Sequence, residues 1–293
     1  MAQSTNSTIQ PLQSFKDEIF SPQAASRYHL SLELSYSGLS YCILDSEKNK
    51  YLLFENYSFQ KINTPELLAN ELVKLVENTE LLTLSYKSVS LSFNTLKFTF
   101  VPDALYDSLL SNAYLKFNIP LLDSELIFTD SVKILETHCV YAIDSKLVAA
   151  ITQLFPRVKI VHTLSSLLEV TGIAYKNSAS KTLVIHLQQN HFELLVMEDK
   201  KLLFANIFAF QTAEDFLYYT LFVCEQLKLN PESMEFRING EVEKNSAIIL
   251  LLSKYVRNIK FGKRPEMFEY SYVFDSVPSH FYFNLFSQVL CVL

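Results

Sequence analysis

Alternation of apolar and polar residues along the chain indicates β-strands. In the first hundred residues this pattern occurs in two stretches of residues 28–45, on either side of 36–38, and again in 51–59 and 88–93. Before the last of these strands, Thr64 supplies a helix N-cap and Pro65 the first helical position, and an apolar stripe follows as far as Asn78. The predicted order of this unit is β-β-β-α-β.

The same order of elements is predicted a second time, after a polar connection at residues 176–181. Strands are expected at 182–187, 192–198, 202–210 and 234–238, with a helix at 212–228 before the last strand. Two short sequences support the repeat: LLFEN at 52–56 recurs as LLFAN at 202–206, and TPE at 64–66 matches TAE at 212–214. We interpret this pattern as an internal duplication.

Further elements lie between and after the two units. The intervening segment is expected to contain a helix at 103–117, a helix capped by Asp144 that runs to Phe155, a strand at 158–161 and a helix at 163–175. The C-terminal part is expected to contain a helix at 244–255, a strand-like alternation from residue 267 and a final helical stripe. Strands and helices therefore alternate over most of the chain, which predicts an α/β fold.

The domain organisation follows from these elements. Residues 1–26 are interpreted as a polar N-terminal tail, 27–178 as a first half with an insertion around 95–138, and 179–293 as a second half. Residues 277–293 are expected to pack back on the first half. With 293 residues and 49% hydrophobic composition, the chain is long enough to form two cores.

Composition narrows the classes of function. The net charge of −6 supplies no general attraction for nucleic acid or an anionic membrane. Residues 1–26 lack the apolar run of a signal peptide and no apolar stretch is long enough to span a bilayer, so a cytoplasmic location is expected. The four cysteines are widely spaced, which favours buried apolar groups over a zinc site.

Glycine is unusually scarce in this chain. Four glycines occur, against about twenty at an average usage of roughly 7%. Because only glycine lets the backbone approach a phosphate without a Cβ in the way, loops that wrap phosphate are expected to be rare. A nucleophile elbow of the Gly-x-Ser-x-Gly type is also missing from the sequence, so no catalytic triad is expected.

The order of elements resembles the superfamily of actin, sugar kinases and chaperone ATPases, in which each half contains a ribonuclease H-like β-β-β-α-β-α-β-α unit. The resemblance covers nearly the whole chain and depends on topology more than on identity. It is closest to the actin-like proteins of type IV pilus assembly and type II secretion, and to an uncharacterised bacterial family of about this length. It implies an actin-like ATPase fold with a cleft between two ribonuclease H-like halves.

The nucleotide-binding motifs of that superfamily are degenerate here. In active members each half begins with a hairpin of the form Asp-x-Gly-Ser/Thr, whose Asp organises Mg²⁺ and whose backbone approaches the phosphates. The first hairpin has Glu33 for the Asp and Gly38 displaced beyond the expected place, and the second has His186 for the Asp. The resemblance implies that the following residues lie at the cleft: Glu33, Ser35, Gly38, His186, Gln188, Asn190, Asn239 and Gly240.

His186 and His191 have both a metal-binding and a structural interpretation. A separation of five residues places them on opposite sides of one extended strand, without a carboxylate or cysteine to complete a cluster. We therefore expect no metal site. His191 is expected in the hairpin turn, and His186 is expected to be partly buried near the cleft.

Two features of the C-terminal region also have two interpretations. A basic run with interleaved aromatic residues is typical of single-stranded nucleic acid binders, or of a solvated helix end: Lys254, Tyr255, Arg257, Lys260, Phe261, Lys263 and Arg264. Phe268, Tyr270, Tyr272 and Phe274 share one face of a predicted strand. This face either packs in the core or forms a surface for a protein partner.

These observations favour a non-catalytic interaction or scaffold protein, a pseudoenzyme with an unidentified protein partner and no cofactor. An alternative is an ATP-binding enzyme or switch with atypical phosphate loops, in which Glu33 takes the magnesium role. A weaker alternative is an RNA-binding module centred on the basic and aromatic C-terminal region, although strong nucleic acid binding is not expected of an acidic chain.

Overall fold

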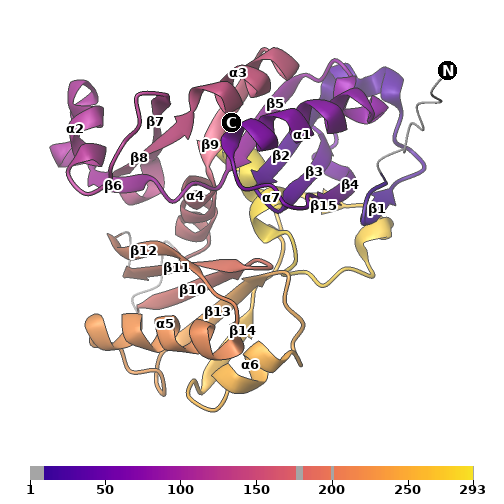
Figure 1. The fold of residues 1–293 in the computed structure, drawn as a ribbon. Coiled ribbons are helices and arrows are strands. Elements are labelled where there is room, and N and C mark those ends of the chain that lie inside the picture. The colour runs from indigo at the N-terminus through magenta and orange to yellow at the C-terminus, as the bar shows by residue number, and fades with distance from the viewer. Residues whose placement is uncertain (1–9, 176–180, 199–200, 293) are drawn as a thin grey trace.

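The computed structural model describes residues 10–175, 181–198 and 201–292 and shows two halves (Figure 1). Each half contains a mixed β-sheet with helices packed against it, and a third, smaller sheet belongs to the insertion in the first half. The α/β class predicted from the sequence is confirmed. The predicted elements at 28–93 and at 182–238 are present in the expected order, with ends that differ by two residues at most.

The first sheet has the strand order β1-β4-β3-β2-β5-β9, and β15 also pairs with β4. Its strands are β1 Gln13–Lys16, β2 Tyr28–Ser35, β3 Gly38–Asp45, β4 Lys50–Ser58, β5 Ser88–Phe93, β9 Val158–His162 and β15 Glu269–Tyr270. Strands β2, β3 and β4 form an antiparallel meander, and β5 and β9 continue the sheet in parallel to β2.

Helices cover both faces of the first sheet. α1 (Pro65–Glu77) and α3 (Ser145–Leu154) pack on one face, and α7 (Phe283–Ser287) packs on the other. The expected helix caps are both present. The Thr64 hydroxyl accepts from the backbone N–H of Leu67 at 3.3 Å, and the Asp144 side chain caps α3. α4 (Thr163–Tyr175) lies between the halves and packs against the second sheet.

The second sheet repeats the arrangement of the first, with the order β12-β11-β10-β13-β14. Its elements are β10 Thr182–Leu187, β11 His191–Glu198, β12 Lys201–Ala209, α5 Ala213–Gln226, β13 Glu235–Gly240, α6 Ala247–Leu252 and β14 Asn258–Phe261. As in the first sheet, three antiparallel strands are followed by two parallel ones. Helix α6 is shorter than the predicted 244–255. Ser246 caps its start, and after Leu252 the chain continues as hydrogen-bonded turns as far as Tyr255.

The strand registers show how the two halves correspond. Both hairpins have a two-residue turn, and in both a register shift follows at the same distance from the turn, after Ile43 in β3 and after Val196 in β11. Ile43 pairs with Leu53 of β4, and Val196 pairs with Phe204 of β12. Leu53 and Phe204 therefore occupy equivalent positions in the two sheets. The LLFEN and LLFAN sequences are therefore one residue out of structural register, although both lie in the third strand of their half.

The insertion forms a three-stranded antiparallel sheet of order β6-β8-β7, from β6 Phe98–Pro102, β7 Glu125–Val132 and β8 Thr137–Asp144. The predicted helix at 103–117 is wrong as a continuous element. Two 3-10 turns precede a short α2 (Ser111–Lys116), because Tyr106 is extended and the Asp107 carboxylate caps a new turn at the N–H of Leu109.

The C-terminal segment returns to the first half. The strand predicted from residue 267 is limited to β15, because Ser271 caps a 3-10 turn at Tyr272–Phe274 and ends the alternation. Phe268 and Phe274 are buried in a cluster with Tyr51 and Phe54 of β4, whereas Tyr272 is 60% exposed. The interpretation as core-facing therefore holds for Phe268 and Phe274 and is wrong for Tyr272.

Two further expectations concern the cysteines and the membrane. Cys42, Cys139 and Cys224 are buried, as expected, and Cys291 is partly exposed. Among the helices in the described ranges, none combines the length and apolar character that a bilayer span requires.

Candidate functional site

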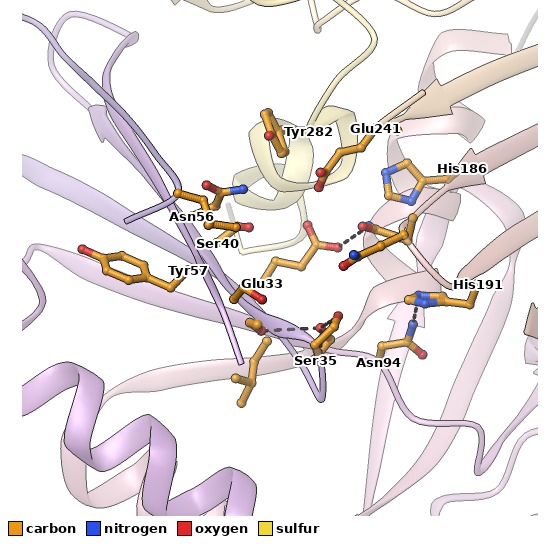
Figure 2. A pocket seen from close by; sticks show the side chains of 18 residues that line it. Glu33, Ser35, Ser40, Asn56, Tyr57, Asn94, His186, His191, Glu241 and Tyr282 are labelled. Atoms are coloured by element: carbon orange, nitrogen blue, oxygen red, sulfur yellow. Dashed lines mark hydrogen bonds between the residues drawn. The ribbon is translucent and has the colours of Figure 1, made fainter. Parts of the chain in front are cut away.

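A cavity of about 100 Å³ lies between the two halves, at the tips of their first hairpins (Figure 2). The β2–β3 hairpin and the neighbouring end of β4 form one wall, and the β10–β11 hairpin and the end of β13 form the other. Tyr282, which precedes α7, closes a third side. This is the position where the sequence resemblance placed a cleft.

The two hairpins contribute corresponding residues to this cavity. Counted from the two-residue turns, Glu33 corresponds to His186 and Ser35 corresponds to Gln188. The Gln188 side-chain amide donates to Glu33 Oε1 at 3.1 Å, a hydrogen bond that joins the first half to the second (Figure 2). The cavity is therefore closed at this point by a direct contact between the halves.

A buried carboxylate joins the two histidines. Glu193 Oε2 lies 3.0 Å from His186 Nδ1, and Glu193 Oε1 lies 3.4 Å from His191 Nε2. Asn94, at the end of β5, also donates to Glu193 Oε1 at 3.4 Å. The expectation that no carboxylate accompanies the histidines is wrong, because the hairpin places them on neighbouring strands and pairs residue 193 directly with residue 186.

Burial and neighbouring charges together set the protonation of Glu33, Glu193 and His186. Burial raises the pKa of Glu33 to about 7, with a further contribution from the negative charges of Glu193 and Glu241. Burial alone would raise the pKa of Glu193, but the hydrogen bonds from His186 and His191 outweigh it and lower that pKa. For His186 burial acts in the opposite direction and is outweighed by the bond to Glu193, so its pKa is raised.

Six of the eight residues predicted at the cleft line the cavity: Glu33, Ser35, Gly38, His186, Gln188 and Gly240. The other two lie elsewhere. Asn190, at the hairpin turn, lines a second cavity, and Asn239 is buried behind the wall against Gly262. His191 is the first residue of β11 and lines both cavities.

The two glycines of the cavity have structural explanations. A Cβ on Gly38 would lie 2.1 Å from the carbonyl oxygen of Tyr57, so close strand packing requires glycine there. Gly240 has a φ of +95°, and its N–H donates to the carbonyl oxygen of His280 at 2.8 Å. The backbone N–H of Gly240 is thus occupied by the C-terminal segment.

Three residues of the site were not predicted from the sequence: Asn94, Glu193 and Tyr282. A signal for Glu193 was available, because a two-residue turn at 189–190 pairs residue 186 with residue 193. Asn94 and Tyr282 come from segments distant in sequence, and only the assembled fold brings them to the cavity.

The cavity is small and its lining is acidic. Small-molecule sites have volumes of about 300–1,000 Å³, and this cavity has about 100 Å³. Among the described residues that line it, two are glutamates and none is a lysine or arginine. Within the described part of the chain, no group of three or more His, Cys, Asp or Glu residues is arranged to hold a metal ion.

A second cavity of about 400 Å³ adjoins the first beyond the β2–β3 turn. It lies where the first half, the insertion and the second sheet meet. Its apolar lining includes Tyr36, Pro65, Phe93, Leu96, Leu147 and Ile207. This volume is within the range of ligand sites.

The basic run at 254–264 is partly engaged in contacts within the chain. Lys260 forms an ion pair with Glu235. Arg264 donates to the carbonyl oxygen of Val277 at 3.0 Å, and its guanidinium lies over the rings of Tyr270 and Phe286. These contacts reduce the positive charge that the run presents to solvent.

Solved structures with this topology define the class of fold. A Bacteroides thetaiotaomicron protein with an actin-like ATPase fold and unknown function aligns with a TM-score of 0.75 and 20% identity, over 83% of this chain and 94% of that chain. A structure of the PilM–PilN type IV pilus biogenesis complex aligns with a TM-score of 0.60 and 13% identity, over 90% and 98%. The chain therefore has the actin-like ATPase fold, which confirms the predicted resemblance.

The sequence itself identifies the family. Residues 17–259 match the family described as "Protein of unknown function (DUF3822)", and the chain belongs to that family. A search of curated proteins gives no match.

Proposed function

We propose that this chain is a cytoplasmic, non-catalytic interaction protein that uses the actin-like fold as a scaffold. The observation that carries the proposal is the cavity at the hairpin tips, where active relatives hold nucleotide. It is small, and the Glu33–Gln188 hydrogen bond closes it. The described residues of its lining include carboxylates but no lysine or arginine. These features disfavour a triphosphate, which needs space and positive charge.

The second cavity is the surface that best suits a protein partner. It is larger and mostly apolar, and Leu96 at its rim is 68% exposed. A concave apolar surface of this kind is a common feature of binding sites. PilM, which shares the fold at 13% identity, was solved in a complex with PilN. By analogy of fold, we propose that a segment of another protein occupies the second cavity of this chain.

We also propose that the two halves arose by duplication. Their sheets share strand order and orientation, and the register shift lies at the same place in both. The LLFEN and LLFAN segments are offset by one residue in the two sheets, so their sequence match does not support the duplication. The support comes from the shared topology.

Variants of two exposed leucines test the partner surface. Leu96→Glu places a charge at the rim of the second cavity and is expected to abolish partner capture without loss of stability. Leu250→Glu is the matched control, because Leu250 is 56% exposed on α6 and does not line the cavity. Affinity purification from the native cell, with quantitative mass spectrometry, is the measurement. Equal recovery of every partner with both variants would contradict the proposed surface.

Millimolar Mg-ATP is expected to leave the melting temperature unchanged. A ligand at one hundred times its dissociation constant adds about 2.7 kcal/mol, which at roughly 2–4 °C per kcal/mol is easily detected. Differential scanning fluorimetry over a range of nucleotide concentrations is sufficient. A dose-dependent rise that disappears in Glu33→Ala would favour the alternative of a nucleotide switch.

A further inference from the structure

The second sheet has an outer edge that no strand of the described part of the chain covers. β12 is the last strand on this side, it is nine residues long, and its only described partner is β11. Its sequence, KLLFANIFA, contains one charged residue, Lys201, and no proline. A bulge at Leu203 interrupts only its first part. Long apolar edge strands of this kind pair readily with strands of other chains, and proteins usually block them with charges, proline or a covering segment.

The equivalent edge in the first half is covered. β1 and β15 both pair with the outer side of β4, and the N–H of Leu12 donates to the carbonyl oxygen of Asn56 at 2.8 Å. Asn56 follows Leu53 by three residues, and Ile207 follows the equivalent Phe204 by three residues. Ile207 therefore has the same place at the edge as Asn56, but no described strand lies beside it.

The pairing with β11 shows which backbone groups are directed out of the sheet. The N–H of Phe210 donates to the turn of the hairpin at 3.1 Å, and in an antiparallel pair every second residue faces the partner strand. The even-numbered residues of β12 from 204 onward therefore bond to β11, and Ala205, Ile207 and Ala209 direct their N–H and C=O groups to the free edge. The side-chain oxygen of Asn206 accepts from the Ile207 N–H at 2.9 Å, in the place of a neighbouring strand.

An exposed aromatic surface of α5 lies beside the same edge. Tyr219 of α5 stacks on Phe208 of β12, with ring centroids 5.0 Å apart. Next to Tyr219, Tyr218 and Phe222 stack on each other and are 63% and 43% exposed. Aromatic residues are enriched in the cores of protein interfaces. The free strand and the aromatic surface thus form one continuous apolar region.

We propose that two copies of this chain form a dimer by antiparallel pairing of their β12 strands, with one continuous sheet across a two-fold axis. The edge is self-complementary. When the pairing is centred on Ile207, Ala205 lies opposite Ala209 of the second copy, and the outward N–H and C=O groups of all three residues are bonded. After its first residue the strand has no charge, so pairing with itself brings no like charges together. Tyr218 and Phe222 of the two α5 helices then lie on the same face of this sheet.

This interface goes beyond the proposed function and does not depend on it. The side chains of Ile207 and Ala209 also line the second cavity, but the pairing uses the backbone of β12 and the outer side of α5. A partner in the second cavity and a dimer through β12 can therefore be tested separately, the first by capture of another protein and the second by the mass of the purified chain.

Sedimentation equilibrium of the full chain over a range of concentrations measures the dimer, and we expect the wild type to reach the mass of two chains. Ala205→Pro removes an N–H that the pairing uses and that β11 does not, so we expect a monomer. Tyr218→Lys changes an exposed side chain and is expected to weaken the dimer about tenfold or more without loss of stability. Leu250→Lys is the matched control, because Leu250 is 56% exposed on α6, away from this surface.

Amide hydrogen exchange, followed residue by residue by NMR, shows whether the dimer uses this edge. The amides of Ala205 and Ala209 are expected to exchange slowly in the wild-type dimer and rapidly in Tyr218→Lys, whereas the Phe208 amide, bonded to β11, is protected in both. A wild type that is monomeric at every concentration would overturn the proposal. A dimer of unchanged affinity in Ala205→Pro, or one in which the Ala205 amide exchanges as fast as in the monomer, would also overturn it.

Discussion

Glu193→Ala is expected to destabilise the folded protein by about 3–5 kcal/mol, the usual cost of removing one partner of a buried charge pair. Glu193 is fully buried, and it is the acceptor for both His186 and His191. Without it, the Nδ1 atom of the buried His186 loses its hydrogen-bond partner, and His191 loses one of its contacts. Urea unfolding followed by circular dichroism measures the loss, with the exposed Glu232→Ala as the matched control.

The effect of Glu193→Ala depends on pH in a direction that follows from the two pKa shifts. The lowered pKa of Glu193 means that its contribution is present above its ordinary pKa of 4.5 and is lost as pH falls further. The raised pKa of His186 means that its contribution is present below 6.5 and is lost as pH rises through the raised value. The stability difference from wild type is therefore expected to be largest between pH 4.5 and 6.5. A difference that is constant from pH 4 to 9 would show that the pair is not charged.

Phe286→Ala is expected to lower stability by about 3–5 kcal/mol, as for other buried phenylalanines. Phe286 is 1% exposed, and its ring lies 4.9 Å from that of Tyr51 and 5.4 Å from that of Phe274. It thus joins α7 to β4 of the first sheet. The same unfolding experiment measures the change.

Tyr272→Ala is the control for this aromatic cluster, because Tyr272 comes from the same C-terminal segment and is 60% exposed. Exposed substitutions of this kind change stability by about 0.5 kcal/mol or less. If Phe286→Ala and Tyr272→Ala were equally stable, the C-terminal segment would not be part of the core of the first half.

The elements that depend on local sequence were predictable, and Thr64, Thr212 and Asp144 show why. Each of these side chains caps the helix that follows, so the start of the helix is encoded within a few residues. Strand alternation at 28–45 and 182–198 is likewise local. In contrast, the 103–117 segment is apolar enough to suggest a helix, but packing of Tyr106 and Tyr114 against the insertion sheet breaks it into turns.

The candidate site was predictable only in part, because its contacts arise from pairing between strands and between halves. Glu33 and His186 were found from their positions in the two hairpins. The Glu193–His186 contact required the hairpin register, and the Gln188–Glu33 contact required the arrangement of the halves. Tyr282 reaches the cavity with a φ of +54°, a backbone conformation that nothing in its local sequence indicates.

The pairing of β15 with β4 has a consequence for how the protein folds as it is synthesised. Part of the outer edge of β4 is covered by a strand from the C-terminal segment, and the Tyr51 hydroxyl donates to the carbonyl oxygen of Phe286, 235 positions later. While the ribosome is still translating the second half, that edge and the apolar face beside it stay uncovered, and such surfaces recruit other chains. The first sheet therefore gains this strand only after residues 269–270 have been synthesised, later than every strand of the second sheet.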